Sequence, residues 1–185
     1  SSSATTAVGT TPPHRVVVLD PGIAEVFVHL NMTDKMVGRP GYTDHLQPIA
    51  HIPTMGTGIT PQYEHIVRTN PDLIMTTGSG GKVLDDLKNI AATQKFDWLR
   101  VSEVVEGTRA IGERMGKPDE ANALANQIAE GLRTTATTDS PRVLLLLGAP
   151  SETATELWYV KKDSLHGAAL AAAGGNNAVT QSFSG

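Results

Sequence analysis

The stretch GYTDH, residues 41–45, contains side chains that could hold a ligand. Tyr42 offers a rigid ring in a segment rich in glycine and proline, which is a good platform for a flat macrocycle, and its hydroxyl could bind ferric iron. Arg39 is the nearby cation and suits a carboxylate through a two-pronged contact. The alternatives are a tyrosine that packs on its own loop and an arginine that is simply solvated.

Two histidines, His45 and His51, flank the same loop. Together with Tyr42 and Asp44 they could form a metal site of nitrogen and oxygen ligands. Their spacing matches no metal-binding motif, so surface histidines are the simpler interpretation. We therefore leave the metal site open, with Tyr42 and His45 as its candidates.

Motifs for catalysis are missing from the chain or have a simpler explanation. The sequence has no cysteine, which excludes cysteine nucleophiles, thiolate metal sites and disulfides. The GSGG stretch at 78–81 lacks the Lys-Ser/Thr pair of a phosphate-binding loop, and no G-x-S-x-G elbow occurs. Asp163, Ser164 and His166 are close in sequence, but Asp163 and Ser164 are more simply the start of a helix. We predict no catalytic residues.

The elements that would position Tyr42 are those of an α/β fold. Residues 59–81, ITPQYEHIVRTNPDLIMTTGSGG, predict a short amphipathic helix, a turn, a buried strand and a glycine loop. Thr60 can cap the helix, and Pro71 ends it because a proline disfavours helical dihedrals at Asn70. An apolar run followed by a glycine loop is typical of a central parallel strand. Ligands of open α/β sheets usually bind at the edge where such strands end.

Strands and helices alternate along the rest of the chain. A buried β-branched strand at 16–19 precedes Asp20, which can cap a helix that begins at Pro21. Apolar residues recur at helical spacing in this helix and in several later segments. These patterns predict helices at 21–30, 82–92, 104–115, after Pro118 and at 164–173, and strands at 36–38, 73–75, 98–101, 142–147 and 157–160.

Composition narrows the class of protein. The 185 residues carry a net charge of −4, and their lysines and arginines are scattered, which argues against a nucleic acid partner. The longest apolar run, 143–147, is too short to cross a bilayer. Residues 1–13, SSSATTAVGTTPP, are small and polar and predict a flexible tether. Such a tether commonly follows a removed signal peptide, from which we infer export.

The order of segments along the chain resembles that of the solute-binding proteins of ABC importers for iron complexes, haem and cobalamin. The segments are RVVVLDPGIAEVFVHLN, MVGRPGYTDH, IPTMG, TPQYEHIVRTNPDLIM and LHGAALAAAGGNNAV, and the resemblance covers residues 15–185. It implies two Rossmann-like α/β lobes, mainly parallel sheets flanked by helices, which one long helix joins and between which the ligand lies. On this basis residues 14–115 are the first lobe, 116–140 the connecting helix, and 141–185 the start of an incomplete second lobe.

The resemblance also implies roles for single residues. Glu64 lies where this family has an acidic residue that docks on arginines of the membrane permease, although by itself it would be an ordinary solvated glutamate. Tyr42 lies where cobalamin-type members have an aromatic residue that lines the cleft. Trp158 and Tyr159 form an aromatic strand pair of the second lobe, with one face expected in the core and the other in the cleft.

The ligand stays open between haem, a ferric siderophore and cobalamin. Haem-binding relatives often have a tyrosine just after the glycine that here is Gly56, whereas this chain has Thr57, which cannot supply a phenolate to ferric haem. The late AAAGGNNAVTQSFSG nevertheless looks closest to the haem branch. No cofactor is expected to be required. The residues expected to contact the ligand are Tyr42, Arg39, Thr57, Trp158 and Tyr159.

The leading hypothesis is a receptor without enzymatic activity at the periplasmic or extracellular face of a bacterial envelope. It would trap an iron complex or corrinoid and deliver it to an ABC permease, and a lipid anchor before processing would fit the polar tether. Two alternatives use the same paired α/β lobes. An enzyme or metallocofactor scaffold would show turnover without a permease, and an extracytoplasmic ligand sensor would be encoded beside a kinase.

Overall fold

The structure is a computed structural model in which residues 11–147 and 158–182 are described. Within these residues no helix is both long and apolar enough to span a membrane. The chain divides into two compact units. The first unit consists of residues 1–97 and 107–124, and the second unit of residues 98–106 and 125–185.

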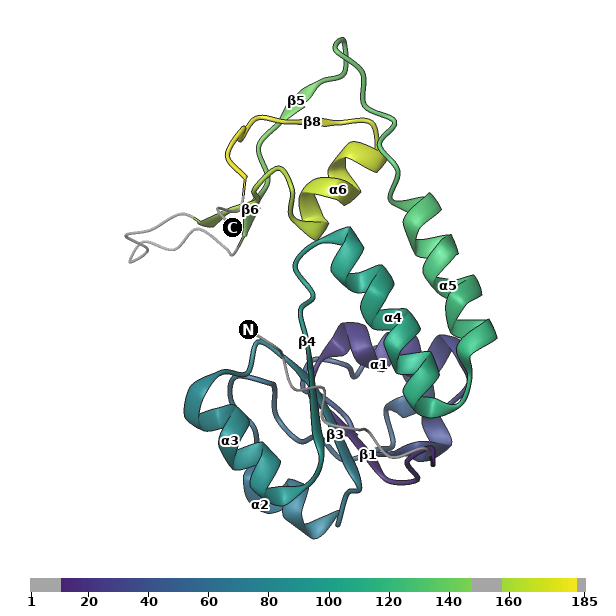
Figure 1. Ribbon diagram of the computed structural model, residues 1–185. Coiled ribbons are helices and arrows are strands. Elements are labelled where there is room, and N and C mark those ends of the chain that lie inside the picture. Colours follow the sequence, from purple (N-terminus) through teal and green to yellow (C-terminus); the bar gives the residue numbers. More distant parts are fainter. Residues whose placement is uncertain (1–10, 148–157, 183–185) are drawn as a thin grey trace, which may run out of the picture. The chain divides into compact units, whose positions relative to one another are not determined.

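A four-stranded parallel sheet forms the centre of the first unit (Figure 1). Its strand order is β2-β1-β3-β4. The strands are β1 (Val16–Val18), β2 (Met36–Gly38), β3 (Leu73–Thr77) and β4 (Thr93–Phe96). The helices between them are α1 (Pro21–His29), α2 (Tyr63–Arg68) and α3 (Gly81–Ile90), with the short 3-10 helices η1 (Thr33–Lys35) and η2 (Gln47–Ile49). The predicted α/β class, a parallel sheet flanked by helices, is confirmed.

The local sequence explains why β1 and α1 form. Val16–Val18 are β-branched and fully buried, and they pair with β2 on one side and β3 on the other. Asp20 then caps α1, because its Oδ1 accepts hydrogen bonds from the amides of Gly22 and Ile23 at 2.8 and 3.2 Å. Pro21 takes the first helical position, where no amide proton is needed. The predicted strand, cap and helix are confirmed.

Helices cover both faces of this sheet. Alternate residues of a strand face opposite sides, and on one side Val17 and Ile74 pack with Met55, with Ile66 of α2 and with Leu87 of α3. Figure 1 shows α2 and α3 together beside the sheet and α1 on its other side. Because β1 and β3 are covered on both faces, their sequences are continuous apolar runs rather than alternating patterns.

Two helices contribute residues to both units. They are α4 (Val101–Met115) and α5 (Pro118–Gly131). Gly116, with φ 76°, ends α4 in the left-handed conformation, and Pro118 begins α5, so the predicted stop and restart are confirmed. The predicted connecting helix 116–140 extends further than α5, which ends at Gly131.

The second unit is built from shorter elements. Strand β5 (Arg142–Val143) pairs in parallel with β8 (Asn176–Asn177), and β6 (Leu146–Leu147) pairs antiparallel with β7 (Trp158–Tyr159). Helix α6 (Leu165–Ala172) is capped by Ser164, whose Oγ accepts from the Gly167 amide at 3.0 Å. Gly174, with φ 88°, follows the helix in the left-handed conformation.

Three local predictions are wrong. The strand predicted at 98–101 is absent, because β4 ends at Phe96 and Val101 already begins α4. Thr60 does not cap α2; its amide donates to the Thr57 hydroxyl, which forms a turn before the helix. The segment predicted as one buried strand at 142–147 forms two strands of two residues each. Each of these has one partner strand among the described residues, which leaves the side chains of Leu144, Leu146 and Leu147 exposed.

The predicted ends of the chain are only partly described. Residues 1–10 of the predicted tether and residue 157 of the last predicted strand lie outside the described residues. Thr11, at the end of that tether, is already attached to the first unit, because its carbonyl accepts from Arg114 Nη1 at 2.9 Å. Residues 98–106, which the sequence places in the first lobe, group with the second unit.

Candidate functional site

The carboxyl ends of β1 and β3 lie next to each other, and polar contacts tie together the segments that leave them. Thr77 Oγ1 donates to Asp20 Oδ2 at 2.5 Å, which joins the end of β3 to the start of α1. The Gly58 amide donates to the Leu19 carbonyl at 3.0 Å, and Ser79 Oγ donates to the Gly58 carbonyl at 2.6 Å. Three segments therefore meet at the edge of the sheet where ligands of open α/β folds bind.

This edge is closely packed around Gly58. A Cβ at this position would collide with the carbonyl oxygen of Thr77 and with the hydroxyl of Thr76. The hydroxyls of Thr76 and Ser79 are buried and lie 2.6 Å apart. In contrast, a Cβ at Gly80 would meet nothing within 4 Å. The backbone at Gly58 is thus packed tightly against the end of β3, whereas Gly80, in the glycine loop after β3, faces open space.

The predicted ligand-binding segment is a loop that we call the Arg39 loop, residues 39–56, and backbone pairing closes its base. The Arg39 amide donates to the Pro53 carbonyl at 3.0 Å, and the Met55 amide donates to the Arg39 carbonyl at 2.8 Å. The Gly41 amide donates to the Gly56 carbonyl at 2.8 Å. These three bonds hold the two arms of the loop together next to β2.

Arg39 lies inside this loop. Its side chain is 8% exposed, and each of its three nitrogens has an acceptor. Nε donates to the Ile52 carbonyl at 2.7 Å, Nη1 to Thr43 Oγ1 at 3.0 Å, and Nη2 to Asp44 Oδ1 at 2.7 Å. Thr43 is fully buried and donates its own proton to the Pro40 carbonyl at 2.7 Å. The alternative of a solvated loop arginine is contradicted, and the guanidinium binds groups of its own loop.

Tyr42 lies on the outside of the Arg39 loop. It is 86% exposed, and its φ of 62° is in the left-handed region, which side chains other than glycine rarely adopt. The alternative of a tyrosine packed on its own loop is therefore contradicted. The structure holds the ring in solvent, in a backbone conformation that has to be maintained by its neighbours.

Thr57 follows the Arg39 loop in a turn that precedes α2. Its Oγ1 accepts from the Thr60 amide at 3.1 Å and lies 3.0 Å from the Thr60 hydroxyl. The side chain is half-buried. The Thr57 hydroxyl therefore stabilises this turn through its contacts with Thr60.

The two histidines of the loop do not converge on a metal site. His45 and His51 are both exposed. Among residues 11–147 and 158–182, no three side chains of histidine, aspartate or glutamate gather where they could hold a metal ion. Tyr42 and His45 stay candidates only as contacts to a metal that arrives with a ligand.

Glu64 lies in the first turn of α2, and its side chain is largely exposed. Its Oε2 lies 3.7 Å from Arg68 Nη2, one helical turn further along. Both side chains are largely exposed, so their attraction is weak. Val67 of the same helix is exposed as well. An acidic and an apolar side chain therefore stand together on the outer surface of α2.

Trp158 and Tyr159 lie on β7 of the second unit, and both are exposed. The expectation that one of the pair packs in a core is wrong, because β7 has a single partner strand among the described residues. Tyr159 Oη donates to Gln181 Oε1 at 2.8 Å, which fixes its ring. Leu146 and Leu147 on the paired strand are also exposed, so the β6–β7 ribbon presents an aromatic and aliphatic surface.

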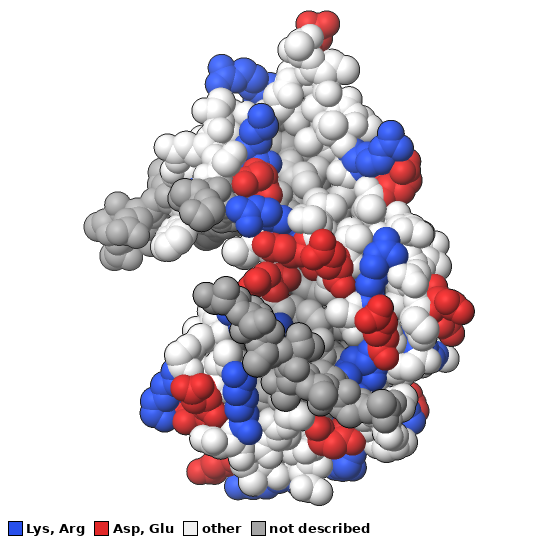
Figure 2. Space-filling model, viewed as in Figure 1, with Lys and Arg blue, Asp and Glu red and all other residues white. Residues whose placement is uncertain are grey.

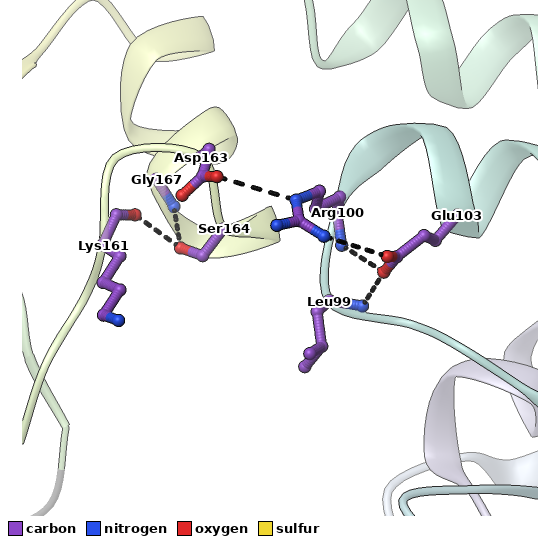
Figure 3. Close-up of polar contacts among 7 residues, drawn as sticks. All are labelled: Leu99, Arg100, Glu103, Lys161, Asp163, Ser164 and Gly167. Carbon is purple, nitrogen blue, oxygen red and sulfur yellow. Dashed lines mark hydrogen bonds and ion pairs between the residues drawn. The ribbon is translucent and has the colours of Figure 1, made fainter. Parts of the chain in front are cut away.

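A second arginine cluster lies in the second unit, and Figure 3 shows it between the starts of α4 and α6. We define this Arg100 cluster as Arg100, Glu103, Asp163 and Ser164. Arg100 Nη1 donates to Glu103 Oε1 at 3.3 Å, and Arg100 Nε lies 3.6 Å from Asp163 Oδ2. The Leu165 amide donates to the Leu99 carbonyl at 2.7 Å. The cluster thus joins the first turn of α4 to the first turn of α6.

The pKa of Glu103 reports its role in this cluster. Partial burial alone would raise the pKa of the carboxyl group. Hydrogen bonds from the amides of Leu99 and Arg100 at 2.8 and 3.0 Å, together with the Arg100 guanidinium, outweigh that effect and lower the pKa below its ordinary value. The carboxylate satisfies amides at a helix start that would otherwise lack partners. Its role is to cap α4.

The Arg39 loop offers a ligand no unpaired positive charge. Figure 2 shows acidic and basic side chains mixed over the face that it presents. The sequence has no lysine or arginine at positions 40–56, and Arg39 itself is paired with Asp44. Because Asp44 and Tyr42 are both exposed, the Arg39 loop presents a ring and a carboxylate to a ligand instead of a free cation.

Sequence reasoning missed Thr43 and Ser79. The buried hydroxyl of Thr43 stabilises the Arg39 loop, and that of Ser79 binds the glycine loop after β3 to Gly58. A threonine or serine in a loop is normally solvated, so residue type alone carries no signal. For Thr43 the position three residues after Pro40 is a pattern in which a hydroxyl can bond backwards to a carbonyl. No comparable signal marks Ser79, whose acceptor is the distant Gly58 carbonyl.

Comparisons with known proteins agree with this architecture. A family model described as periplasmic binding protein matches residues 16–185. A search of curated protein sequences found no match.

Several solved structures share the fold. A periplasmic haem-binding protein from Pseudomonas aeruginosa has a TM-score of 0.78 at 22% identity, over 91% of this chain and 64% of that one. The periplasmic vitamin B12-binding protein of Vibrio cholerae has a TM-score of 0.73 at 20% identity, over 94% and 69%. A siderophore-binding protein solved with two molecules of acinetobactin and ferric iron has a TM-score of 0.72 at 22% identity, over 96% and 67%. The chain spans about two thirds of the length of these structures.

Proposed function

The chain belongs to the periplasmic binding protein family, and we propose that it acts as the solute-binding component of an ABC importer. Its ligand is haem, a ferric siderophore or cobalamin, and its partner is the importer's membrane permease. The family is a class of binding proteins rather than of enzymes, so the proposed mechanism is capture and delivery without chemical change.

The observation that carries this proposal is the Tyr42 ring, which a closed loop holds in solvent. A rigid exposed ring supplies a stacking surface for a flat macrocycle, and its phenolic oxygen is a good ligand for ferric iron. Both properties suit the ligand classes of the structures with similar folds, which bind haem, vitamin B12 and a siderophore complex of ferric iron. We assign the main ligand contact of the first unit to Tyr42.

Three further residues are proposed as ligand contacts, one in the first unit and two in the second. Thr57 adds a hydroxyl beside the sheet edge in the first unit, in place of the phenolate that a tyrosine would offer. In the second unit, Trp158 and Tyr159 supply two exposed rings on one short ribbon. Rings of this kind bind large, flat and partly apolar ligands well, because they bury much area with few rotatable bonds.

Glu64 is the proposed docking residue for the permease. Its position in the first turn of α2 and its exposure leave it free to meet arginines of a partner. Charge pairs of this kind mainly set the orientation and rate of encounter. The proposed location is the periplasm or the outer face of the envelope, with a lipid anchor before processing.

Ligand capture is tested by titrating the protein with haemin, cyanocobalamin and a ferric siderophore while tryptophan fluorescence and the Soret band are recorded. We expect saturable binding of at least one compound, weakened by Tyr42→Ala. Tyr42→Phe keeps the ring but removes the phenolate, so it separates stacking from iron coordination. Tyr63→Phe, on the core side of α2, is the matched control. Absence of saturable binding for all three compounds would contradict the proposal.

Docking is tested by reversing the charge of Glu64. In cells or proteoliposomes that contain the cognate permease, Glu64→Lys should lower uptake by about tenfold or more, while the affinity for ligand stays within about twofold. Glu25→Lys reverses an exposed glutamate on α1 and is the matched control for net charge. Equal damage to uptake and to ligand binding would show that Glu64 has a different role.

A further inference from the structure

The Arg39 loop buries a charged side chain for which ligand capture alone gives no reason. An arginine with an 8% exposed side chain is uncommon, because removing a cation from water is costly unless its donors find partners. The three acceptors around Arg39 all belong to its own loop. The guanidinium is therefore an internal support of this loop.

We propose that Arg39 is a positioning residue that fixes Tyr42 for the ligand and does not touch the ligand itself. This inference rests on the proposed function, because it takes Tyr42 as the ligand contact. It also restricts the ligand contact of this loop to stacking or phenolate binding. A carboxylate of the ligand finds no free cation here.

The geometry of the three hydrogen bonds supports this role. Ile52, which accepts from Nε, lies on the returning arm of the loop, whereas Thr43 and Asp44 lie directly after Tyr42. The guanidinium thus links the two arms across the loop interior. On the other side of Tyr42, the Gly41 amide is bound to the Gly56 carbonyl. Both neighbours of Tyr42 are therefore fixed, and the residue between them has little conformational freedom.

The backbone conformation of Tyr42 shows why such support is needed. A φ of 62° is unfavourable for a tyrosine, and an exposed ring gains little burial in compensation. An unsupported loop would relax to a negative φ and turn the ring away. Residues in rare conformations persist where the surrounding structure determines them, and here Arg39 and its acceptors are that structure.

The charge of Arg39 is already balanced, which argues against a role as a ligand cation. Nη2 donates to Asp44, whose side chain is 87% exposed. A ligand carboxylate would have to displace Asp44 and break a charge-assisted hydrogen bond. The interior bonds to Ile52 and Thr43 would then hold the guanidinium back from the ligand.

Hydrogen exchange tests the positioning role without any ligand. Arg39→Lys keeps the positive charge but can satisfy only part of the three acceptors. We expect the amides of Gly41 and Met55 to exchange about tenfold faster or more in this variant. The amide of Ile74, inside β3, is the internal control and should keep its rate. Unchanged exchange at Gly41 and Met55 would overturn the proposal.

Binding tests the same role with whichever of haemin and cyanocobalamin the protein takes up. Arg39→Lys, Arg39→Ala and Tyr42→Ala should each weaken binding by a similar factor, about threefold to tenfold. Arg39→Lys combined with Tyr42→Ala should cause no further loss, because both changes remove the same contact. Unchanged binding in Arg39→Lys would show that the hydrogen bonds of Arg39 are not needed to position the ring, and losses that multiply in the double variant would show a separate contact of Arg39 with the ligand. Either result would overturn the proposal.

Because substitutions of the buried Arg39 could prevent folding, a variant at an exposed position gives a second test of its role. Asp44→Ala removes an exposed carboxylate and leaves the bonds of Arg39 to Ile52 and Thr43 in place. If Arg39 only positions Tyr42, haemin binding should stay the same or weaken slightly. If Arg39 were a ligand cation, the loss of its competitor would tighten haemin binding and overturn the proposal. A wild-type protein that binds none of haemin, cyanocobalamin and the ferric siderophore contradicts the proposed function instead, and the exchange experiment still decides the role of Arg39.

Discussion

The Arg39 loop and the Arg100 cluster use the same kinds of group at different depths. Each contains an arginine, a carboxylate and a hydroxyl that donates to the carbonyl three residues earlier, Thr43 to Pro40 in one and Ser164 to Lys161 in the other. The side chain of Arg39 is 8% exposed, whereas that of Arg100 is 36% exposed. The two clusters therefore contain the same kinds of group but differ in how deeply the arginine side chain is buried.

This difference in burial decides what each arginine can do. Inside the Arg39 loop water cannot replace a lost partner, so the hydrogen bonds select one backbone conformation and hold Tyr42 in it. In the Arg100 cluster water reaches the charges, so their attraction is screened and its loss is partly compensated. The first cluster therefore presents a side chain, and the second one caps and joins two helices.

The largest effect is expected from Thr43→Val, which keeps the shape of the side chain but removes its hydroxyl. The Arg39 Nη1 donor and the Pro40 carbonyl would then lose a partner in the interior. We expect the free energy of unfolding in urea to fall by about 1–3 kcal/mol. Thr60→Val, at an exposed position, is the matched control and should change it by less than about 0.5 kcal/mol. Equal effects of the two variants would remove the contrast between buried and exposed hydroxyls.

The buried framework could be predicted from the sequence because its signals are local. Three valines in a row, followed by Asp20 and Pro21, specify a buried strand and a capped helix within six residues. The glycine after α4 and the proline that begins α5 work in the same way. These signals need no knowledge of the rest of the chain. They were sufficient for the α/β class and for most of the helices.

The polar site could be predicted only in outline. The sequence points to Tyr42 and Arg39, but the partner of Arg39 at Ile52 depends on the path of a closed loop, which no local pattern encodes. The strand expected at 98–101 is absent for a different, local reason. Glu103 reaches back to the amides of Leu99 and Arg100 and starts a helix there, and this capping outweighs the weak strand signal.

An intermediate effect is expected from Ser164→Ala in the second unit. Ser164 Oγ accepts from the Gly167 amide, so its loss leaves the start of α6 without its cap. We expect a decrease of about 1 kcal/mol in the free energy of unfolding, within a range of about 0.5–2 kcal/mol. Ser102→Ala, at an exposed position within α4, should leave the value unchanged or raise it slightly. A loss larger than that of Thr43→Val would reverse the proposed order of the two clusters.

The smallest effect, and the one that separates the clusters by mechanism, is expected from Glu103→Gln. A glutamine still accepts the amide hydrogen bonds of the cap, so only the charge is lost, at a cost of about 0.5–1 kcal/mol near neutral pH.

Because folding lowers the pKa of Glu103, its charge stabilises the folded state above the ordinary glutamate pKa of 4.5, and this stabilisation is lost as the pH falls through the lower folded-state pKa. The difference between wild type and Glu103→Gln should therefore shrink below pH 4.5 and with added salt, whereas the difference for Thr43→Val should depend on neither. Urea unfolding of wild type and both variants over a series of pH values and salt concentrations would measure these differences in the free energy of unfolding. If the difference between wild type and Glu103→Gln did not change with pH, the Glu103 carboxylate would not stabilise α4 through its charge.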